Sequence, residues 1–364
     1  MPQPLSGIKV LDLTNLLPGP LATLFLAEAG AEVLKIERPG GDDLRFYEPV
    51  WEGTGAAFGL LNRGKTAITL DLKSTEDANR LRALLQDTDI LVEQFRPGVM
   101  DKLGFGYEAL RNAHPRLIYC SITGYGQNGP RAAEAGHDLN YIGNTGLLAL
   151  QPGPPDRPVV PPALVADIGG GTFPAVINIL LALRQCDLTG QGCHLDIAMT
   201  DAMFTFAWHA LARGWATGRF PAPGDSELTG GSPRYQLYST QDGRLVACAA
   251  LEDHFWQRFA SAIALDDVLV DDRRDPAATE ATVAALIANR TAAEWEPVFA
   301  QADCCVTIMR SLEDATRDPH FAARGMFTRT LRGKDGGRMP ALPVPIAPQF
   351  RDSPDSEKTA PPLA

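Results

Sequence analysis

The sequence lacks the cysteine and histidine spacings that hold metals or cross-link small folds. None of its six cysteines forms a C-x-x-C pair, and none of its six histidines belongs to an H-E-x-x-H segment. Such spacings mark zinc sites and metalloproteases, and disulfide frameworks belong mainly to short secreted chains. We therefore expect neither a structural metal nor a set of disulfides.

Positive charge is also scarce. The chain has 33 Lys and Arg against 44 Asp and Glu, which gives a formal net charge of -11. This balance disfavours non-specific attraction to nucleic acid and to anionic membranes, because both require a concentrated positive surface. We expect neither as a partner, so a polyanionic ligand must meet a local group of basic residues.

Export and membrane features are not apparent in the sequence. No N-terminal run combines a basic start, an apolar middle and a small-residue cleavage site, and no stretch is expected to be apolar for long enough to span a bilayer. These observations favour a cytoplasmic location.

The first part of the chain alternates short strands with helical patterns. Val, Ile and Leu dominate the expected strands at 8–13, 31–37, 66–72, 89–95 and 116–126, and helices are expected at 21–30, 74–89, 167–190 and 201–214. This alternation predicts an α/β fold with a large Rossmann-like domain and a mostly parallel sheet. Ligands of such sheets bind beyond the carboxyl ends of the strands.

A second, smaller α+β domain is expected after a Gly/Pro/Ser-rich stretch. At 364 residues with 45% hydrophobic composition, the chain is long enough for two domains. Segment 235–251 alternates apolar and polar residues around an Asp-Gly turn, which indicates a hairpin. The expected ranges are a large domain at 1–217, a linker at 218–232, a small domain at 233–325, and a segment at 326–364 that returns toward the large domain. The proline-rich end, 345–364, is expected to be an extended arm or a frayed tail.

A dinucleotide site is disfavoured, although Glu37 ends a strand where a ribose-binding acid could lie. The turn after the first strand, "TNLLPGPLA", has one glycine and two prolines in place of G-x-G-x-x-G.

Basic residues recur in the loops that follow the strands. They are Arg38, Arg63, Lys65, Arg96 and Lys102. Each could be ordinary surface charge, but their recurrence at strand ends favours a ligand that carries phosphate groups.

Two titratable residues lie at expected helix starts. His137 stands in "GHDLNY" and Asp167 in "VADIGGG". Each has a plain alternative: His137 as a polar neighbour of a capping Asp138, and Asp167 as a simple N-cap. Together they favour an enzyme site, because glycines beside them could let a ligand approach.

The chain resembles the family III CoA-transferases, and within them the α-methylacyl-CoA racemase branch. The resemblance rests on "GIKVLDLTNLLPGPLATLFLAEAGAEVLKIERPGGDDLR", "NRGKTAITLDLK", "VEQFRPGVMDKLGFGYEAL" and "PRLIYCSITGYGQNGP". The motif "GHDLNY" matches the racemases, whereas the transferases generally lack its histidine. The transferases' mobile glycine-run loop is reduced here to "TGGSP", and Ala163 replaces a common polar residue of racemases.

The resemblance implies a catalytic set. His137 and Asp167 would be the two bases of a racemase, Glu252 an acid near the histidine, and the backbone N–H of Asp138 the donor to an enolate oxygen, with Gly169 and Gly170 permitting close approach. The resemblance also implies an interlocked homodimer. CoA would be part of the substrate, and no other cofactor is expected.

The CoA site implied by the resemblance lies on the loops after the strands. Arg38 and Lys102 would meet phosphates, Leu72 and Phe95 would line the adenine site, and Arg96 would be a neighbour. Gln94 stands where many relatives have asparagine.

The expected activity is racemisation of a 2-methylacyl-CoA thioester by proton transfer through an enolate. The alternative within the family is CoA transfer between carboxylic acids through an acyl-aspartyl intermediate at Asp167. A CoA-ester binding protein without turnover is a third alternative.

Overall fold

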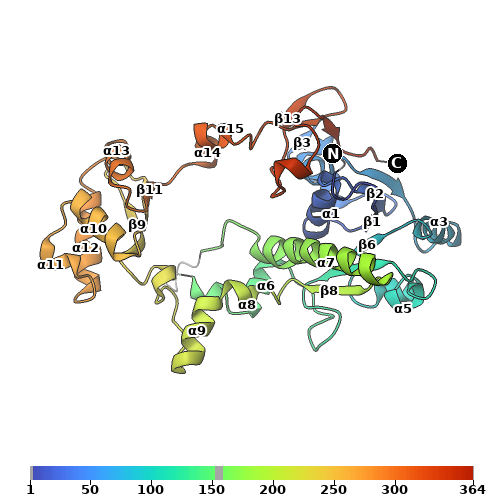
Figure 1. The fold of residues 1–364 in the computed structure, drawn as a ribbon, viewed down its shortest axis with the longest axis horizontal. Coiled ribbons are helices and arrows are strands. Elements are labelled where there is room, and N and C mark those ends of the chain that lie inside the picture. The colour runs from blue at the N-terminus through green and yellow to red at the C-terminus, as the bar shows by residue number, and fades with distance from the viewer. Residues whose placement is uncertain (1–2, 152–158, 364) are drawn as a thin grey trace. The chain divides into compact units, whose positions relative to one another are not determined.

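The computed structural model describes residues 3–151 and 159–363. The described chain divides into two compact units (Figure 1). Unit 1 comprises Met1–Thr145, Pro161–Phe206 and Pro319–Ala364, and unit 2 comprises Gly146–Val160 and Ala207–Asp318. Unit 2 therefore begins before the expected linker, and the chain re-enters unit 1 at Pro319 instead of at 326.

Unit 1 is built on a six-stranded parallel sheet in the order β5-β2-β1-β6-β7-β8. Its strands are β1 (Lys9–Leu13), β2 (Glu32–Glu37), β5 (Thr66–Thr69), β6 (Ile90–Glu93), β7 (Ile118–Thr123) and β8 (His194–Ala198). The α/β class and the parallel sheet are thus confirmed. Strands β6 and β7 are buried along their whole length, which explains their near-continuous apolar sequence.

The helices of unit 1 lie between these strands in the chain and after them. They are α1 (Pro18–Glu28), α2 (Ala56–Asn62), α3 (Thr75–Leu85), α4 (Val99–Lys102), α5 (Tyr107–Leu110), α6 (Asp138–Asn144), α7 (Phe173–Thr189), α8 (Met203–Phe206) and α15 (Pro319–Ala323). A π-helical segment, Ala166–Thr172, runs directly into α7. Gly190 ends α7 at φ 74°, a left-handed conformation that glycine adopts without steric cost.

The helical stretch Ala166–Thr189 is long and apolar enough to cross a membrane by length and composition alone. The expectation that no stretch would qualify is therefore wrong. In this structure 39% of its most apolar window is buried inside the protein, and Ala175, Ile179 and Ala182 belong to the core. A core helix of a folded domain passes the same test, so the finding is weak evidence for a span.

The C-terminal segment is folded onto unit 1. Strands β12 (Thr330–Arg332), β13 (Arg338–Pro340) and β14 (Lys358–Thr359) form a small sheet, and β3 (Val50–Trp51) pairs with β4 (Thr54–Gly55). Near the chain end, the carbonyl of Pro361 accepts a hydrogen bond from Arg45 at 3.0 Å. The end of the chain is therefore a docked arm and not a frayed tail.

A buried carboxylate, Glu28 at the end of α1, fixes this arm to the rest of unit 1. Glu28 is 1% exposed and pairs with the equally buried Arg63 at 3.0 Å. Arg351, from the C-terminal segment, forms a second ion pair with it, and Lys358 lies 3.8 Å away. One carboxylate thus neutralises basic groups that are far apart in the sequence.

Unit 2 contains the three-stranded sheet β11-β10-β9, which is antiparallel throughout. Its elements are α9 (Trp208–Thr217), β9 (Tyr235–Ser239), β10 (Leu245–Ala249), α10 (Asp253–Ala262), α11 (Asp267–Val270), α12 (Pro276–Ile287), α13 (Ala292–Ala302), β11 (Val306–Ile308) and α14 (Leu312–Thr316). The predicted hairpin is confirmed, with Gly243 at φ 74° in its turn. One helix was expected over 201–214, whereas α8 ends at Phe206 and α9 begins at Trp208.

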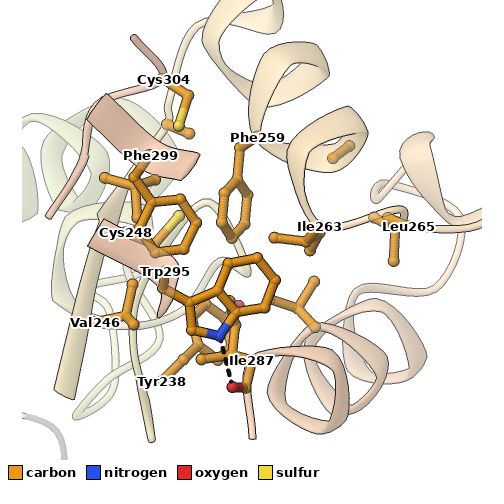
Figure 2. Packing of buried hydrophobic residues seen from close by; sticks show 14 of the residues in the cluster. Tyr238, Val246, Cys248, Phe259, Ile263, Leu265, Ile287, Trp295, Phe299 and Cys304 are labelled. Carbon is orange, nitrogen blue, oxygen red and sulfur yellow. Dashed lines mark hydrogen bonds between the residues drawn. The ribbon is translucent and has the colours of Figure 1, made fainter. Parts of the chain in front are cut away.

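An aromatic cluster forms the core of unit 2 (Figure 2). The rings of Trp295 and Phe299 stack with centroids 5.2 Å apart, and the indole N–H of Trp295 donates to the carbonyl of Ile287 at 2.9 Å. The buried polar end of the indole is therefore satisfied.

We expect Glu28→Gln to destabilise unit 1 by about 3 kcal/mol, because it leaves the buried Arg63 without its countercharge. The free energy of unfolding in urea measures the loss. Glu108→Gln, in the exposed ion pair with Arg111, is the matched control and should cost less than about 1 kcal/mol. Equal losses in the two variants would contradict the role given to Glu28.

Candidate active site

His137 caps the start of α6. Its carbonyl accepts the N–H of Asn140 at 2.8 Å, and its own N–H donates to the Asn140 side chain at 3.0 Å. The imidazole is exposed. The N-cap is therefore His137, and the alternative in which Asp138 caps this helix is wrong.

Tyr141, which the sequence analysis did not assign to the site, holds the turn before His137. Its hydroxyl donates to the carbonyl of Gly136 at 2.6 Å. A Cβ atom at Gly136 or Gly124 would lie within 2.6 Å of the Tyr141 ring, so the glycine of "GHDLNY" is required for packing. The ring of Tyr141 thus leaves no space for a side chain at Gly136.

Asp138 links the two predicted proton carriers. Its carboxylate is 5% exposed, and its Oδ1 accepts the backbone N–H groups of Ala166 at 2.7 Å and Asp167 at 3.0 Å. A carboxylate at the start of a helix satisfies N–H groups that have no partner inside the helix. The residue after His137 therefore fixes the backbone of Asp167.

Asp167 lies in the first turn of the π-helical segment and is partly buried. Burial, together with the neighbouring negative charge of Asp138, raises the pKa of its carboxyl group to about 6, while His137 opposes the rise. His137 and Asp138 therefore lie close enough to Asp167 for their charges to act on its carboxyl group. A carboxyl group with this pKa can exchange protons close to neutral pH.

The glycines after Asp167 pack against protein. A Cβ atom at Gly170 would lie 2.1 Å from the carbonyl oxygen of Met199, and one at Gly169 would lie 2.6 Å from the ring of Phe206. The expectation that Gly169 and Gly170 let a ligand approach is therefore wrong for the Cβ side of both residues. They let the π-helical segment pack closely against Met199, which follows β8, and against Phe206 of α8.

Three of the predicted CoA-binding residues line one cavity at the carboxyl ends of β1, β2 and β6. They are Arg38, Gln94 and Phe95. Gln94 also accepts the N–H of Gly19 at 3.1 Å, at the start of α1. Arg38 projects into solvent, with 67% of its side chain exposed, and pairs with Asp43 at 2.5 Å.

The remaining predicted CoA-binding residues, Leu72, Arg96 and Lys102, do not line this cavity. Leu72 and Phe95 both pack, half-buried, against one apolar cluster of unit 1. Arg96 and Lys102 are exposed, and the charge of Arg96 acts on the phenol of Tyr141. Arg96 therefore lies near Tyr141 of α6, the helix that begins directly after His137.

Two of the basic residues assigned to a phosphate ligand are structural. Arg63 is 1% exposed and pairs with Glu28. Lys65 is 4% exposed, and its ammonium group donates to Asp12 at 3.0 Å and to Thr23 at 2.8 Å. Their assignment to the ligand is wrong, because both cations are buried against carboxylates.

The carboxylate of Glu37, the ribose-binding candidate of the disfavoured dinucleotide site, is also paired with a protein side chain. It forms a buried ion pair with Arg45, whose Nε lies 2.8 Å from its Oε2. Its carboxylate stabilises the loop after β2.

Glu252 lies in unit 2, where it caps the start of α10. Its role beside His137 stays a prediction. Ala163 is exposed, three residues before the π-helical segment. Among the described residues, no group of three or more His, Cys, Asp or Glu side chains could hold a metal ion.

Glu93 is a second residue that the sequence analysis did not single out. It ends β6 directly before Gln94, and it is 4% exposed. A carboxylate at the end of an otherwise apolar strand, next to three predicted ligand contacts, was the available indication.

The parallel sheet and the titratable residues on its loops define an α/β enzyme, and comparison with known proteins gives its family. The model of CoA-transferase family III matches residues 5–364, so the chain belongs to CoA-transferase family III. This confirms the resemblance.

The relatives include two kinds of enzyme. Alpha-methylacyl-CoA racemase of Homo sapiens is 34% identical, over 96% of this chain and 90% of its own. Acetyl-CoA:oxalate CoA-transferase of Acetobacter aceti is 35% identical, over 99% of this chain and 93% of its own. A crystal structure of a CAIB/BAIF family protein from Brucella suis has a TM-score of 0.84 and 32% identity, covering 100% of this chain and 97% of that one. Racemase and transferase are equally similar, so the comparisons define the family and leave the reaction open.

We expect opposite shifts in the pKa of Asp167 from two substitutions. Asp138→Asn should lower it, because a neighbouring negative charge is removed, and His137→Ala should raise it, because an opposing interaction is removed. Titration of the Asp167 carboxyl carbon by NMR measures both. Shifts of the same sign would show that the two residues do not act on Asp167 as described.

Proposed function

We propose that this protein is a racemase of 2-methylacyl-CoA thioesters. The observation that carries the proposal is the pairing of His137 with Asp167, whose pKa burial raises to about 6, through the carboxylate of Asp138. Racemisation through an enolate needs one proton carrier on each face of the substrate carbon. A histidine and a carboxyl group that titrates near neutrality meet this requirement.

In the proposed mechanism, one of the two residues removes the hydrogen from C2, which the thioester carbonyl acidifies. The bonding electrons move onto the carbonyl oxygen and form an enolate. The other residue then returns a proton to the opposite face. The N–H of Asp138, in the first turn of α6, would donate to the enolate oxygen, and Glu252 would orient His137.

CoA is proposed to bind across the loops at the carboxyl ends of the strands. Arg38 and Lys102 would meet its phosphates, Leu72, Gln94 and Phe95 would lie along its adenosine end, and Arg96 would lie beside it. The shared cavity of Arg38, Gln94 and Phe95 supports this placement. The exposed guanidinium of Arg38 would exchange Asp43 for a phosphate group, which it can bind by two parallel hydrogen bonds.

A homodimer is also proposed. Helix α7 exposes a row of apolar side chains, at least 38% accessible in each case, formed by Phe173, Ile177, Leu180, Leu181 and Leu188. A contiguous apolar surface of this kind marks an association site in proteins outside the membrane. A second copy of the chain would cover it.

The alternative reaction is CoA transfer, and the equal similarity to a CoA-transferase supports it. Asp167 would then attack the thioester carbonyl, release CoA as a thiolate and form a mixed anhydride. A second carboxylate would accept the acyl group. An acyl-aspartyl adduct trapped on Asp167 would favour this reaction.

In D₂O, we expect the protein to incorporate deuterium at C2 of a (2R)-2-methylacyl-CoA and to form the 2S epimer, both followed by NMR. His137→Ala should abolish epimerisation and leave CoA binding intact. Binding of CoA without exchange, across several acyl chains, would contradict racemisation and favour acyl transfer through Asp167.

Arg38→Ala should raise KM for the thioester by about tenfold, because a charge-assisted hydrogen bond to phosphate is lost, while kcat changes little. Steady-state kinetics measure both constants. Arg80→Ala, which removes an exposed arginine of α3 paired with Asp77, is the control. An unchanged KM in Arg38→Ala would overturn this placement of CoA.

A further inference from the structure

The carboxylate of Glu93 holds the turn that carries three predicted CoA contacts. Glu93 ends β6, and its Oε2 accepts the N–H of Phe95 at 2.8 Å. Gln94, Phe95 and Arg96 follow in the chain, and Gly98 closes the turn at φ 79°. The carboxylate therefore acts on the backbone of the turn and does not itself need to touch a ligand.

Residues on neighbouring strands link Glu93 with a histidine at the surface. In the sheet, Glu93 on β6 is opposite Ser121 on β7, whose hydroxyl favours the ionised form of the carboxylate. The Ser121 Oγ lies 3.0 Å from Nε2 of His194 on β8. The His194 ring is exposed and stacks on Tyr107.

The charges that act on Glu93 are acidic. Burial has the largest effect, and with the negative charges of Asp101 on α4 and Asp196 on β8 it raises the pKa of Glu93 to about 7. The Ser121 hydroxyl and the N–H of Phe95 oppose the rise. On β7, burial raises the pKa values of the Tyr119 phenol and the Cys120 thiol, and the negative charge of Glu93 contributes to the rise. Both groups therefore stay protonated near neutral pH. Glu93 thus changes charge within the physiological range.

We propose that Glu93 is a positioning residue for CoA, and that loss of its negative charge loosens the Gln94–Gly98 turn and weakens CoA binding. The inference rests on the proposed CoA site. A hydrogen bond to an ionised carboxylate is stronger than one to its neutral form, so the turn is held best when Glu93 is charged. By linkage, CoA binding then favours the charged form and releases a proton near pH 7.

Calorimetric titration with CoA itself, between pH 5.5 and 8.5, tests the proposal on the full-length protein. Glu93→Gln keeps the size of the side chain and an oxygen acceptor for Phe95, but it has no charge at any pH. At pH 8 we expect it to bind CoA about five- to tenfold more weakly than the natural protein, the difference between a charged and a neutral hydrogen bond. At pH 5.5 the two proteins should bind equally.

Two controls make the result specific. The 3′-phosphate of CoA itself titrates near pH 6, as phosphate monoesters do at about that value, and the Glu93→Gln profile supplies this baseline. Ser121→Ala removes a donor that favours the charged carboxylate, so the midpoint of the pH dependence should move to higher pH. A merely structural loss would weaken binding without moving the midpoint. Circular dichroism and thermal unfolding establish that each variant is folded.

The outcomes separate this inference from the proposed function. If the natural protein fails to bind CoA at pH 8, the CoA site itself is wrong. If it binds CoA, but Glu93→Gln binds equally or more tightly at pH 8, the positioning role is overturned. If Glu93→Gln does not fold, an unmoved midpoint in Ser121→Ala overturns it instead.

Discussion

The site depends on one buried carboxylate, that of Asp138. By accepting the N–H groups of Ala166 and Asp167, it joins the start of α6 to the start of the π-helical segment. The same negative charge disfavours ionisation of Asp167. One side chain therefore fixes the backbone of Asp167 and raises its proton affinity, while the residue before it in the chain supplies the imidazole.

The interior of unit 1 contains buried ion pairs. Lys65 and Asp12 lie inside unit 1, as do Arg63 and Glu28, with both partners of each pair almost fully buried. Such pairs contribute little net stability, but removing one partner is costly because the other remains as an unpaired buried charge. Neither Arg63 nor Lys65 is therefore available to a ligand. Among the predicted phosphate-binding residues, Arg38, Arg96 and Lys102 are the ones whose positive charge is exposed.

Much of the large unit could be predicted from sequence because short runs rich in Val, Ile and Leu alternate with helical patterns, and the strands β6 and β7 are buried along their whole length. The pattern at 89–95 predicted β6, and the Asp-Gly turn predicted the β9–β10 hairpin, since both depend on local sequence. The break between α8 and α9 could not be predicted, because the apolar pattern continues across it. The burial of Lys65 depends on a partner 53 residues away in the chain, and loop position alone could not reveal it.

The candidate site was predictable to a similar extent. The motifs around His137 and Asp167 predicted two proton carriers, and in the structure Asp138, next to His137, accepts the backbone N–H of Asp167. The packing role of Gly169 and Gly170 could not be foreseen, because it depends on Met199 and Phe206, which lie about 30 residues later in the chain. Glu93 was missed because its carboxylate acts through the backbone of Phe95 and through Ser121 on a neighbouring strand, contacts that a linear pattern does not display.

The most direct test of two bases on opposite faces is deuterium exchange by the single variants His137→Ala and Asp167→Asn with each pure enantiomer of a 2-methylacyl-CoA. Each variant keeps one base, so each should exchange C2 hydrogen of one enantiomer without inversion, and the two variants should select opposite enantiomers. Exchange of the same enantiomer by both variants, or loss of all exchange in both, would contradict the assignment of His137 and Asp167 to opposite faces.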